Sequence, residues 1–173
     1  LPCRASMSTF QIQPVARIHT PFQEKFAIPR QPLLAPAALG IIELLPPYDH
    51  PEALAGLEQS SHLWIIFLFH EALPDPARPP RLMVRPPRLG GNEKAGVFAT
   101  RSSHRPNGLG QSVVRIDKIK GTRIHVSGID LLDGTPVIDI KPYIPYADCL
   151  PQATSAMAPD APPSIPVNWH NNA

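Results

Sequence analysis

Apolar and polar residues along most of the chain follow the short alternations and short apolar runs that are typical of β-strands. Residues 10–18 (FQIQPVARI) alternate apolar and polar positions, and residues 40–45 (GIIELL) form a short apolar run. Residues 61–70 (SHLWIIFLFH) are the most hydrophobic stretch, and their aromatic and β-branched content favours a buried central strand over a helix. Further strands are predicted for residues 96–100 (GVFAT), 112–116 (SVVRI) and 123–128 (RIHVSG).

Turn and helix signals complete the predicted architecture. The dipeptide Asp133-Gly134 separates Leu131-Leu132 from residues 136–140 (PVIDI), which predicts a hairpin. Residues 51–57 (PEALAGL) begin with proline and carry apolar residues at helical spacing, which predicts a short helix. Six or so strands without helices between them predict a mainly β fold: a small, single-domain β-barrel with one or two short helices, and not a Rossmann domain.

Composition supports this architecture and suggests how the chain is divided. The 24 prolines among 173 residues are far above the usual share, and proline is excluded from helix interiors and central strands. We expect the barrel domain over residues 9–150. Residues 1–8 are interpreted as a leader or a remnant of cloning, with Met7 as the natural start. Residues 151–173 are interpreted as a proline-rich C-terminal arm or the start of a truncated C-terminal segment.

Charge is unevenly distributed along the chain. The net charge is only +2, but residues 78–105 contain seven cations and one acid, so this segment is near +6 and the rest near −4. A basic stretch on a nearly neutral protein indicates an anionic partner, most commonly a nucleic acid. A solvated loop whose arginines pair with carboxylates elsewhere is the alternative.

Several classes of site and location are not indicated by the sequence. Cys3 and Cys149 give no disulfide or metal framework, and the seven histidines show no metal-ligand spacing, so no metal is expected. No apolar stretch approaches the ~20 residues of a membrane helix, and no membrane association is expected. Together these features predict a reducing, cytoplasmic compartment. The glycine-rich turns that bind dinucleotides or triphosphates are also absent.

Long stretches of polar, proline and glycine residues in distinctive order identify a family. They are EKFAIPRQP (24–32), SHLW (61–64), FH (69–70), RPPRLGGN (85–92), GVFATRS (96–102), RPN (105–107) and DLLDGTPVIDIKPYIPYAD (130–148). In these stretches the chain resembles the TsaA-like (TrmO) family over roughly residues 10–151. Bacterial members of that family methylate N6-threonylcarbamoyladenosine at position 37 of tRNA, next to the anticodon.

The resemblance implies a small β-barrel, S-adenosylmethionine as methyl donor, the anticodon loop of tRNA as substrate, and a homodimer with its sites near the subunit interface. By motif match the implied cofactor contacts are Gln31, Pro32, Leu33, Phe69, His70, Arg101, Gln111, Ser127, Gly128, Ile129 and Asp130. The chain departs from the family pattern at Gly108, where a proline is usual, which predicts a looser loop. Bacterial relatives also often continue into a further C-terminal segment.

The acceptor nitrogen in that reaction resembles an acylated amine, so it needs a base or a hydrogen-bond acceptor for its proton. The predicted catalytic residues are Asp130, Asp139, Lys141 and Tyr143. The last three residues also have simpler interpretations. Asp139 would then form a structural pair with an arginine, Lys141 would be a surface residue, and Tyr143 would pack against neighbours rather than stack on a base. Asp133 is interpreted first as a turn residue, and His70 has a hydrogen-bonded core role as its alternative.

Substrate contacts are predicted at Arg85, Arg88, Arg105 and Asn107. Arg85 and Arg88 would follow the RNA backbone, and fixed cations at Arg101 and Arg105 suit a phosphate or the cofactor carboxylate. Asn107 would either shape the turn or bind the base. Two other functions remain open at this point: a non-catalytic RNA-binding barrel, and a methyltransferase of the same fold with another substrate.

Overall fold

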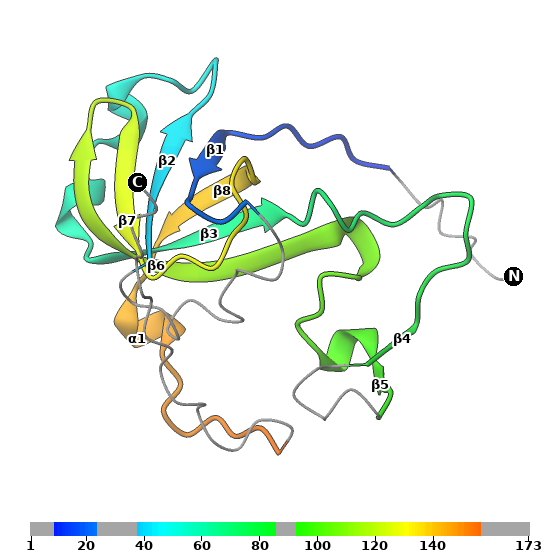
Figure 1. Cartoon of the computed structure of the whole chain (residues 1–173). Coiled ribbons are helices and arrows are strands. Elements are labelled where there is room, and N and C mark those ends of the chain that lie inside the picture. Colours follow the sequence, from blue (N-terminus) through cyan, green and yellow to red (C-terminus); the bar gives the residue numbers. More distant parts are fainter. Residues whose placement is uncertain (1–8, 24–37, 86–92, 157–173) are drawn as a thin grey trace, which may run out of the picture.

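A computed structural model describes residues 9–23, 38–85 and 93–156 of the chain. Six antiparallel strands close into a barrel in the order β1-β2-β7-β6-β3-β8 (Figure 1). The barrel strands are β1 (Ala16–His19), β2 (Leu39–Leu44), β3 (His62–Leu68), β6 (Leu109–Lys120), β7 (Arg123–Ser127) and β8 (Pro136–Pro142). A separate two-stranded ribbon joins β4 (Met83–Val84) to β5 (Ala95–Gly96). The predicted mainly β, barrel-like fold is confirmed.

Alternation along the strands fills the barrel interior with branched aliphatic side chains. On β3, Leu63, Ile65 and Phe67 are buried and the residues between them are partly exposed. Ile18, Ile42 and Ile124 are adjacent in the register of β1, β2 and β7, and each is fully buried. Residues that oppose one another in the register share a face of the sheet, so the apolar side chains of all strands pack together inside the barrel. Because the barrel is closed, none of these strands is left with an unpaired edge.

Helical segments are short, and four of the five in the described residues are 3-10 helices: Pro51–Leu54, Leu57–Gln59, Val97–Ala99 and Pro106–Gly108, beside α1 (Pro145–Asp148). The helix predicted over residues 51–57 is therefore two 3-10 turns. The interruption is at Gly56, whose φ of 89° lies in the left-handed region and ends any continuous helix.

Three strand predictions differ from the structure. Residues 10–15 are not in a strand, and the exposure of Phe10 and Ile12 shows that their alternation faces no core. Residues 97–99 form a 3-10 turn instead of continuing the strand of β5. Residues 131–132 are not the first arm of a hairpin, because β8 pairs with β1 and β3.

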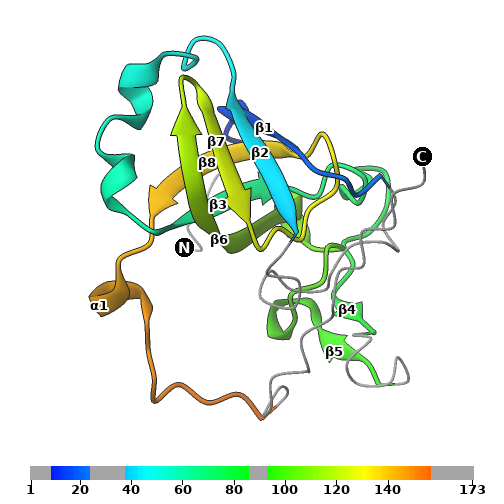
Figure 2. The same ribbon diagram turned by 60° about the vertical axis from the view of Figure 1, so that its left-hand side comes forward.

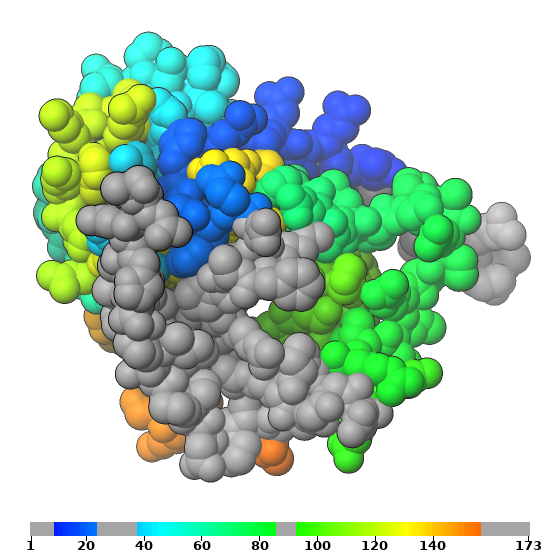
Figure 3. Space-filling view, viewed as in Figure 1, coloured from blue at the N-terminus to red at the C-terminus, as the bar shows by residue number. Residues whose placement is uncertain are grey.

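The barrel has two distinct ends. Residues 128–135 close one end, which we call the loop end; His19, Leu39, Ser127, Leu68 and Pro136 lie at the strand termini there. The opposite end, which we call the cavity end, is covered by the 3-10 helices of residues 51–59 (Figure 2). Residues 93–108 extend from the barrel on the side away from the β6–β7 hairpin (Figure 3).

Candidate functional site at the loop end

The loop of residues 128–135 is fastened to the barrel at several points. Gly128 donates its backbone N–H to the carbonyl of Ala38 (2.9 Å), and Gly134 donates to Ile18 (2.9 Å). The buried Thr20 hydroxyl donates to the carbonyl of Leu131 (2.8 Å), and the Thr20 N–H donates to the Asp133 carboxylate (3.0 Å). The loop is therefore a fixed part of the barrel, and Asp133 has the structural role that its turn position predicted.

Asp130 lies in the middle of this loop with its carboxylate directed at the inner face of β6. The Ser112 hydroxyl donates to Asp130 Oδ1 at 2.8 Å, and Ser112 is itself buried beside Ile65. Burial raises the pKa of the Asp130 carboxyl from 3.8 to about 6, against the opposing effects of the Ser112 hydrogen bond and the nearby Arg101 charge. A carboxylate with a raised pKa is a stronger proton acceptor than an ordinary aspartate.

Arg101 and Arg105 belong to the loop that extends beside this end of the barrel. Arg101 is exposed and close enough to Asp130 to lower its pKa through charge. Arg105 instead donates from Nη1 to the carbonyl of Thr100 (2.9 Å), while the Thr100 hydroxyl donates to Val97 (3.0 Å). Arg105 thus holds the loop in shape, whereas the Arg101 guanidinium is the cation presented toward Asp130.

Phe69 and His70 follow the end of β3 at the same end of the barrel. The Phe69 ring stands edge-on to Phe67, with 5.2 Å between ring centroids. Gly110 makes this packing possible, because a Cβ there would lie 2.5 Å from Phe67 and 2.8 Å from Phe69. Gln111, the next residue on β6, is exposed on the outer face.

Gly108 is held tightly rather than loosely. It is buried with φ of 60°, donates its N–H to Arg105 (3.1 Å) and accepts from Phe69 (2.7 Å). Proline can supply neither that φ nor that N–H, so the backbone here requires a residue other than proline. The neighbouring Asn107 also has a positive φ, 63°, which supports its turn-shaping role.

The Ser127–Asp130 turn presents backbone rather than side chains, apart from Asp130. The Ser127 hydroxyl donates to the Asp117 carboxylate at 3.0 Å. Ile129 is fully buried in the core, and Gly128 has a φ of 76° that favours glycine. Any ligand contact from Gly128 and Ile129 would therefore come from their main-chain groups.

The other predicted catalytic residues lie elsewhere in the chain. The register pairs Asp139 with Ile66 and Lys141 with Trp64, on the outer face of β8 and β3. Lys141 Nζ is 2.6 Å from Asp139 Oδ2, so Asp139 pairs with a lysine and not with an arginine. The structure does not bring Asp139 and Lys141 together with Asp130 in one chain.

Tyr143 also belongs to this outer region. Its ring is 6.0 Å from that of Trp64 and 6.5 Å from that of His62, and its N–H donates to the His62 carbonyl (3.0 Å). Partial desolvation, with Cys149 and Asp148 nearby, raises the pKa of the Tyr143 phenol, which keeps it protonated. These contacts are those of a packing residue.

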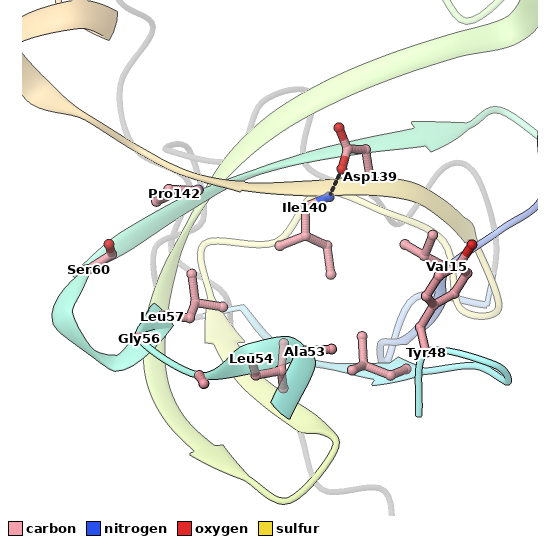
Figure 4. A pocket seen from close by; sticks show the side chains of 12 residues that line it. Val15, Tyr48, Ala53, Leu54, Gly56, Leu57, Ser60, Asp139, Ile140 and Pro142 are labelled. Atoms are coloured by element: carbon pink, nitrogen blue, oxygen red, sulfur yellow. Dashed lines mark hydrogen bonds between the residues drawn. The ribbon is translucent and has the colours of Figure 1, made fainter. Parts of the chain in front are cut away.

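A cavity of about 480 Å³ lies at the cavity end (Figure 4), and Asp130 is not among its lining residues. Its lining includes Val15, Leu44, Tyr48, Leu54, Leu57 and Ile140. Asp139 stands at its rim with the carboxylate turned away from the middle, accepting the backbone N–H of Ile140 at 2.9 Å. The lining is mainly apolar and presents no buried ionisable group, so we place the chemistry at Asp130 and not in this cavity.

Some predicted residues fall outside the described part of the chain: Gln31, Pro32, Leu33 and Arg88. Arg85 is described and exposed, directly after β4.

Within residues 9–23, 38–85 and 93–156, no group of three or more histidine, cysteine or acidic side chains is arranged to hold a metal ion. The same segments contain no helix of the length and apolar character that crossing a membrane requires.

Sequence reasoning missed Ser112 and Thr20 as parts of the site. Ser112 and Asp130 are 18 residues apart in the sequence and meet only because β6 and the loop come together in the fold. Thr20 and Leu131, which also hydrogen-bond, are 111 residues apart. A single polar residue inside an otherwise apolar alternation, such as Ser112 next to Val113 and Val114, is the signal that could have marked it.

Comparison with known proteins shows consistent similarity over most of the chain. The sequence profile of the tRNA-methyltransferase O N-terminal domain matches residues 17–149. A Pseudomonas aeruginosa protein named putative S-adenosylmethionine-dependent methyltransferase RcsF is 63% identical over 162 residues, which cover 94% of this chain and 66% of that protein. The Escherichia coli tRNA (adenine(37)-N6)-methyltransferase is 48% identical, covering 90% of this chain and 67% of the relative.

The human tRNA (adenine(37)-N6)-methyltransferase is 42% identical over an alignment that covers 91% of this chain and 35% of the human protein. Among solved structures, the crystal structure of TrmO from P. aeruginosa superimposes with a TM-score of 0.75 at 54% identity, over 90% of this chain and 66% of that one. The chain therefore spans about two thirds of the length of these bacterial relatives.

Proposed function

The chain belongs to the tRNA-methyltransferase O family, and on that premise we propose that it transfers a methyl group from S-adenosylmethionine to N6 of threonylcarbamoyladenosine at position 37 of tRNA. The observation that carries the proposal is Asp130. It is a half-buried carboxylate whose pKa is raised to about 6 by desolvation, held by Ser112 in a fixed loop at one end of the barrel. A perturbed carboxyl in such a position is a recognised mark of a functional site.

The side chains at the loop end fit this cofactor chemically. Arg101 offers a guanidinium to a carboxylate such as that of the methionine part, and Asp130 offers an anion to ribose hydroxyls or to the positive sulfur. Phe69 and His70 offer aromatic surface. The Gly128–Ile129 backbone offers its carbonyl groups, because both N–H groups donate to Ala38. We propose that these residues, with Gln111 and Ser127 and with Gln31, Pro32 and Leu33, form the binding site.

When bound, S-adenosylmethionine supplies a methyl group that is already activated by the positive charge on its sulfur. The protein then has two tasks, to align the acceptor nitrogen and to remove its proton. We assign the second task to Asp130, whose ionised carboxylate would accept the N–H proton as the nitrogen gains the methyl group and the sulfonium leaves as a neutral thioether. Ser112 keeps the carboxylate oriented by donating to Oδ1.

We propose that tRNA is bound through its anticodon loop by Arg85, Arg88, Arg105 and Asn107, in the region with the highest density of cations. Arg85 is exposed, and Asn107 is exposed at the tip of a turn. Arg105 contributes by fixing the loop through Thr100. Phosphate contacts of this kind position RNA, while recognition of the modified base depends on the site itself.

We further propose that the protein is a homodimer acting in the cytoplasm. The outer face of β3 carries Trp64 and Ile66, and the adjacent strand β6 carries Val113; all three are partly exposed apolar residues. Such a face suits a second copy of the chain. Roles for Asp139, Lys141 and Tyr143 in catalysis remain a prediction that requires this second copy, because they lie on the outer wall of the barrel.

The decisive experiment uses purified protein, S-adenosylmethionine and two tRNA preparations, one with threonylcarbamoyladenosine at position 37 and one without. Mass analysis of digested tRNA should show one added methyl group on the threonylcarbamoyladenosine and none in the second preparation. Methylation of plain adenosine would change the substrate assignment. Absence of cofactor binding by calorimetry would refute the methyltransferase proposal.

A further inference from the structure

The outer wall of the barrel over β1, β2, β7 and β6 presents two outward-facing rows of mostly polar residues, fixed by strand register. One row runs Arg17, Glu43, Arg123 and Lys120 across the four strands. The second runs His19, Ile41, His125 and Lys118. Opposed residues share a face, and the fully buried Ile18, Ile42 and Ile124 alternate with these positions, so both rows point outward.

This wall, which we call the basic wall, carries an excess of positive charge. With Arg115 and Asp117 included, it has five cations and two carboxylates: Arg17, Arg115, Lys118, Lys120 and Arg123 against Glu43 and Asp117. Arg123 donates twice to Glu43, at 3.1 and 2.7 Å, and Arg115 lies 3.8 Å from Asp117. Lys118 and Lys120 are exposed and form no ion pair with another residue of the described segments.

The opposite wall is different in character. There β3 presents Trp64 and Ile66, and the single charged pair on β8 is Lys141 with Asp139, which cancels. The excess of cations is therefore confined to one side of the barrel. On β6, Lys118 and Lys120 are two residues apart on the same face, so their Cα atoms are about 6–7 Å apart, whereas Glu43 lies between Arg17 and Arg123 in the register. An excess of cations on one surface of this kind complements a polyanion.

The basic wall leads directly to the loop that carries Asp130. His19 Nε2 is 2.9 Å from Glu43, and His19 Nδ1 is 3.9 Å from Asp133, three residues after Asp130. The strands of the wall lie side by side in Figure 2, and the loop of residues 128–135 lies between the β6–β7 hairpin and residues 93–108 in Figures 1 and 2. Cations thus flank the Asp130 loop on both sides.

We propose that the basic wall is a second RNA-binding surface, on which Lys118 and Lys120 contact the phosphate backbone of the tRNA at a distance from the modified nucleotide. The inference rests on the proposed function for the identity of the RNA. Its own support is the register, the uncompensated charge and the continuity of the wall with the Asp130 loop. Phosphate contacts of this kind add affinity and orientation without reading sequence.

The test measures tRNA binding by fluorescence anisotropy at several salt concentrations for the wild type and for Lys118→Gln/Lys120→Gln. Loss of two phosphate contacts should weaken binding roughly tenfold near physiological salt and reduce the slope of log affinity against log salt by about 2. The matched control is Lys118→Arg/Lys120→Arg, which keeps both charges and should bind as the wild type does. S-adenosylhomocysteine affinity and the rate at saturating tRNA should be unchanged in both variants.

An unchanged salt slope in the glutamine variant, with cofactor affinity intact, would overturn the proposal. So would binding to vesicles containing phosphatidylglycerol that depends on both lysines while tRNA binding does not. Failure of the proposed function has a different signature: tRNA binding would still depend on the two lysines, but the wild type would transfer no methyl group.

Discussion

The two ends of the barrel are built from the same strands but closed in different ways. The cavity end is covered by 3-10 helices, and Leu54 and Leu57 pack there against the apolar core around an open space of about 480 Å³. The loop end is closed by residues 128–135, which are hydrogen-bonded to the barrel and carry two carboxylates: Asp133 accepts from the Thr20 N–H, and Asp130 accepts from Ser112. Among the described residues, the cavity end has the open space of about 480 Å³, and the loop end has the carboxylate whose pKa is raised.

This difference shows why the size of a cavity is a poor guide to chemistry in a small barrel. Apolar lining can hold a ligand but cannot take a proton, whereas a buried carboxylate with a raised pKa can. The desolvation that prepares Asp130 also destabilises its ionised form. The loop end therefore retains an electrostatic penalty that would be selected against if it served no purpose.

The largest expected effect is on methyl transfer when Asp130 is changed. Asp130→Asn keeps an acceptor for the Ser112 hydroxyl and removes the base, so the rate should fall about 10²- to 10⁴-fold. In the wild type, the rate should rise with pH through about 6, because the proton acceptor must be ionised. Rates of labelled methyl incorporation between pH 5 and pH 8 measure both effects; a flat profile would exclude Asp130 as the base.

At the cavity end we expect a loss of stability without a loss of chemistry. Leu54 is 6% exposed, and Leu54→Ala should reduce the free energy of unfolding by about 2–5 kcal/mol. Binding of S-adenosylhomocysteine to the folded fraction should be unchanged, as chemical denaturation and calorimetry can show. Loss of cofactor binding in this variant at a temperature where it is fully folded would move the site to the cavity end.

Asp130→Asn should also stabilise the protein above pH 6. A pKa raised from 3.8 in the unfolded chain to about 6 corresponds to a destabilisation of the ionised form by at most about 3 kcal/mol. Between about pH 4 and pH 6 the folded state binds more protons than the unfolded state. The wild type therefore loses stability relative to the variant as the pH rises through this range, and above about pH 6 the difference in stability is constant. Thermal unfolding of both proteins across that range gives the difference, and a variant less stable at pH 7.5 would contradict the assigned burial.

The smallest effect is expected at the exposed pair on the outer wall. Lys141 and Asp139 are 60% and 44% exposed, so Lys141→Met should change the free energy of unfolding by less than about 1 kcal/mol. Denaturant titration measures this change, with Lys141→Arg as the control that retains the charge. If the rate of methyl transfer falls in Lys141→Met while stability and cofactor affinity stay unchanged, Lys141 either binds tRNA or belongs to the site of a second copy of the chain.

Much of the fold follows from local pattern, because the apolar runs of β2 and β3 and the apolar positions of β7 predict strands that a small β fold must bury. The prediction of a hairpin around Asp133-Gly134 failed for a non-local reason: Asp133 is bonded to Thr20 and Phe22 of the first strand region, so residues 131–132 serve the loop. Asp130 was predicted through family resemblance. Its partner Ser112 was not, since their contact depends on how β6 and the loop meet in space.

The position of the cofactor site at the loop end can be tested by mapping the binding of the cofactor product onto the protein by NMR. Amide signals would be assigned and followed while S-adenosylhomocysteine is added to the wild-type chain. Our account predicts that the shifted signals belong to Arg101, residues 108–112 and residues 127–131 at the loop end. Shifts centred on Tyr48, residues 53–57 and Ile140 would place the ligand in the cavity and would rule out a cofactor site beside Asp130.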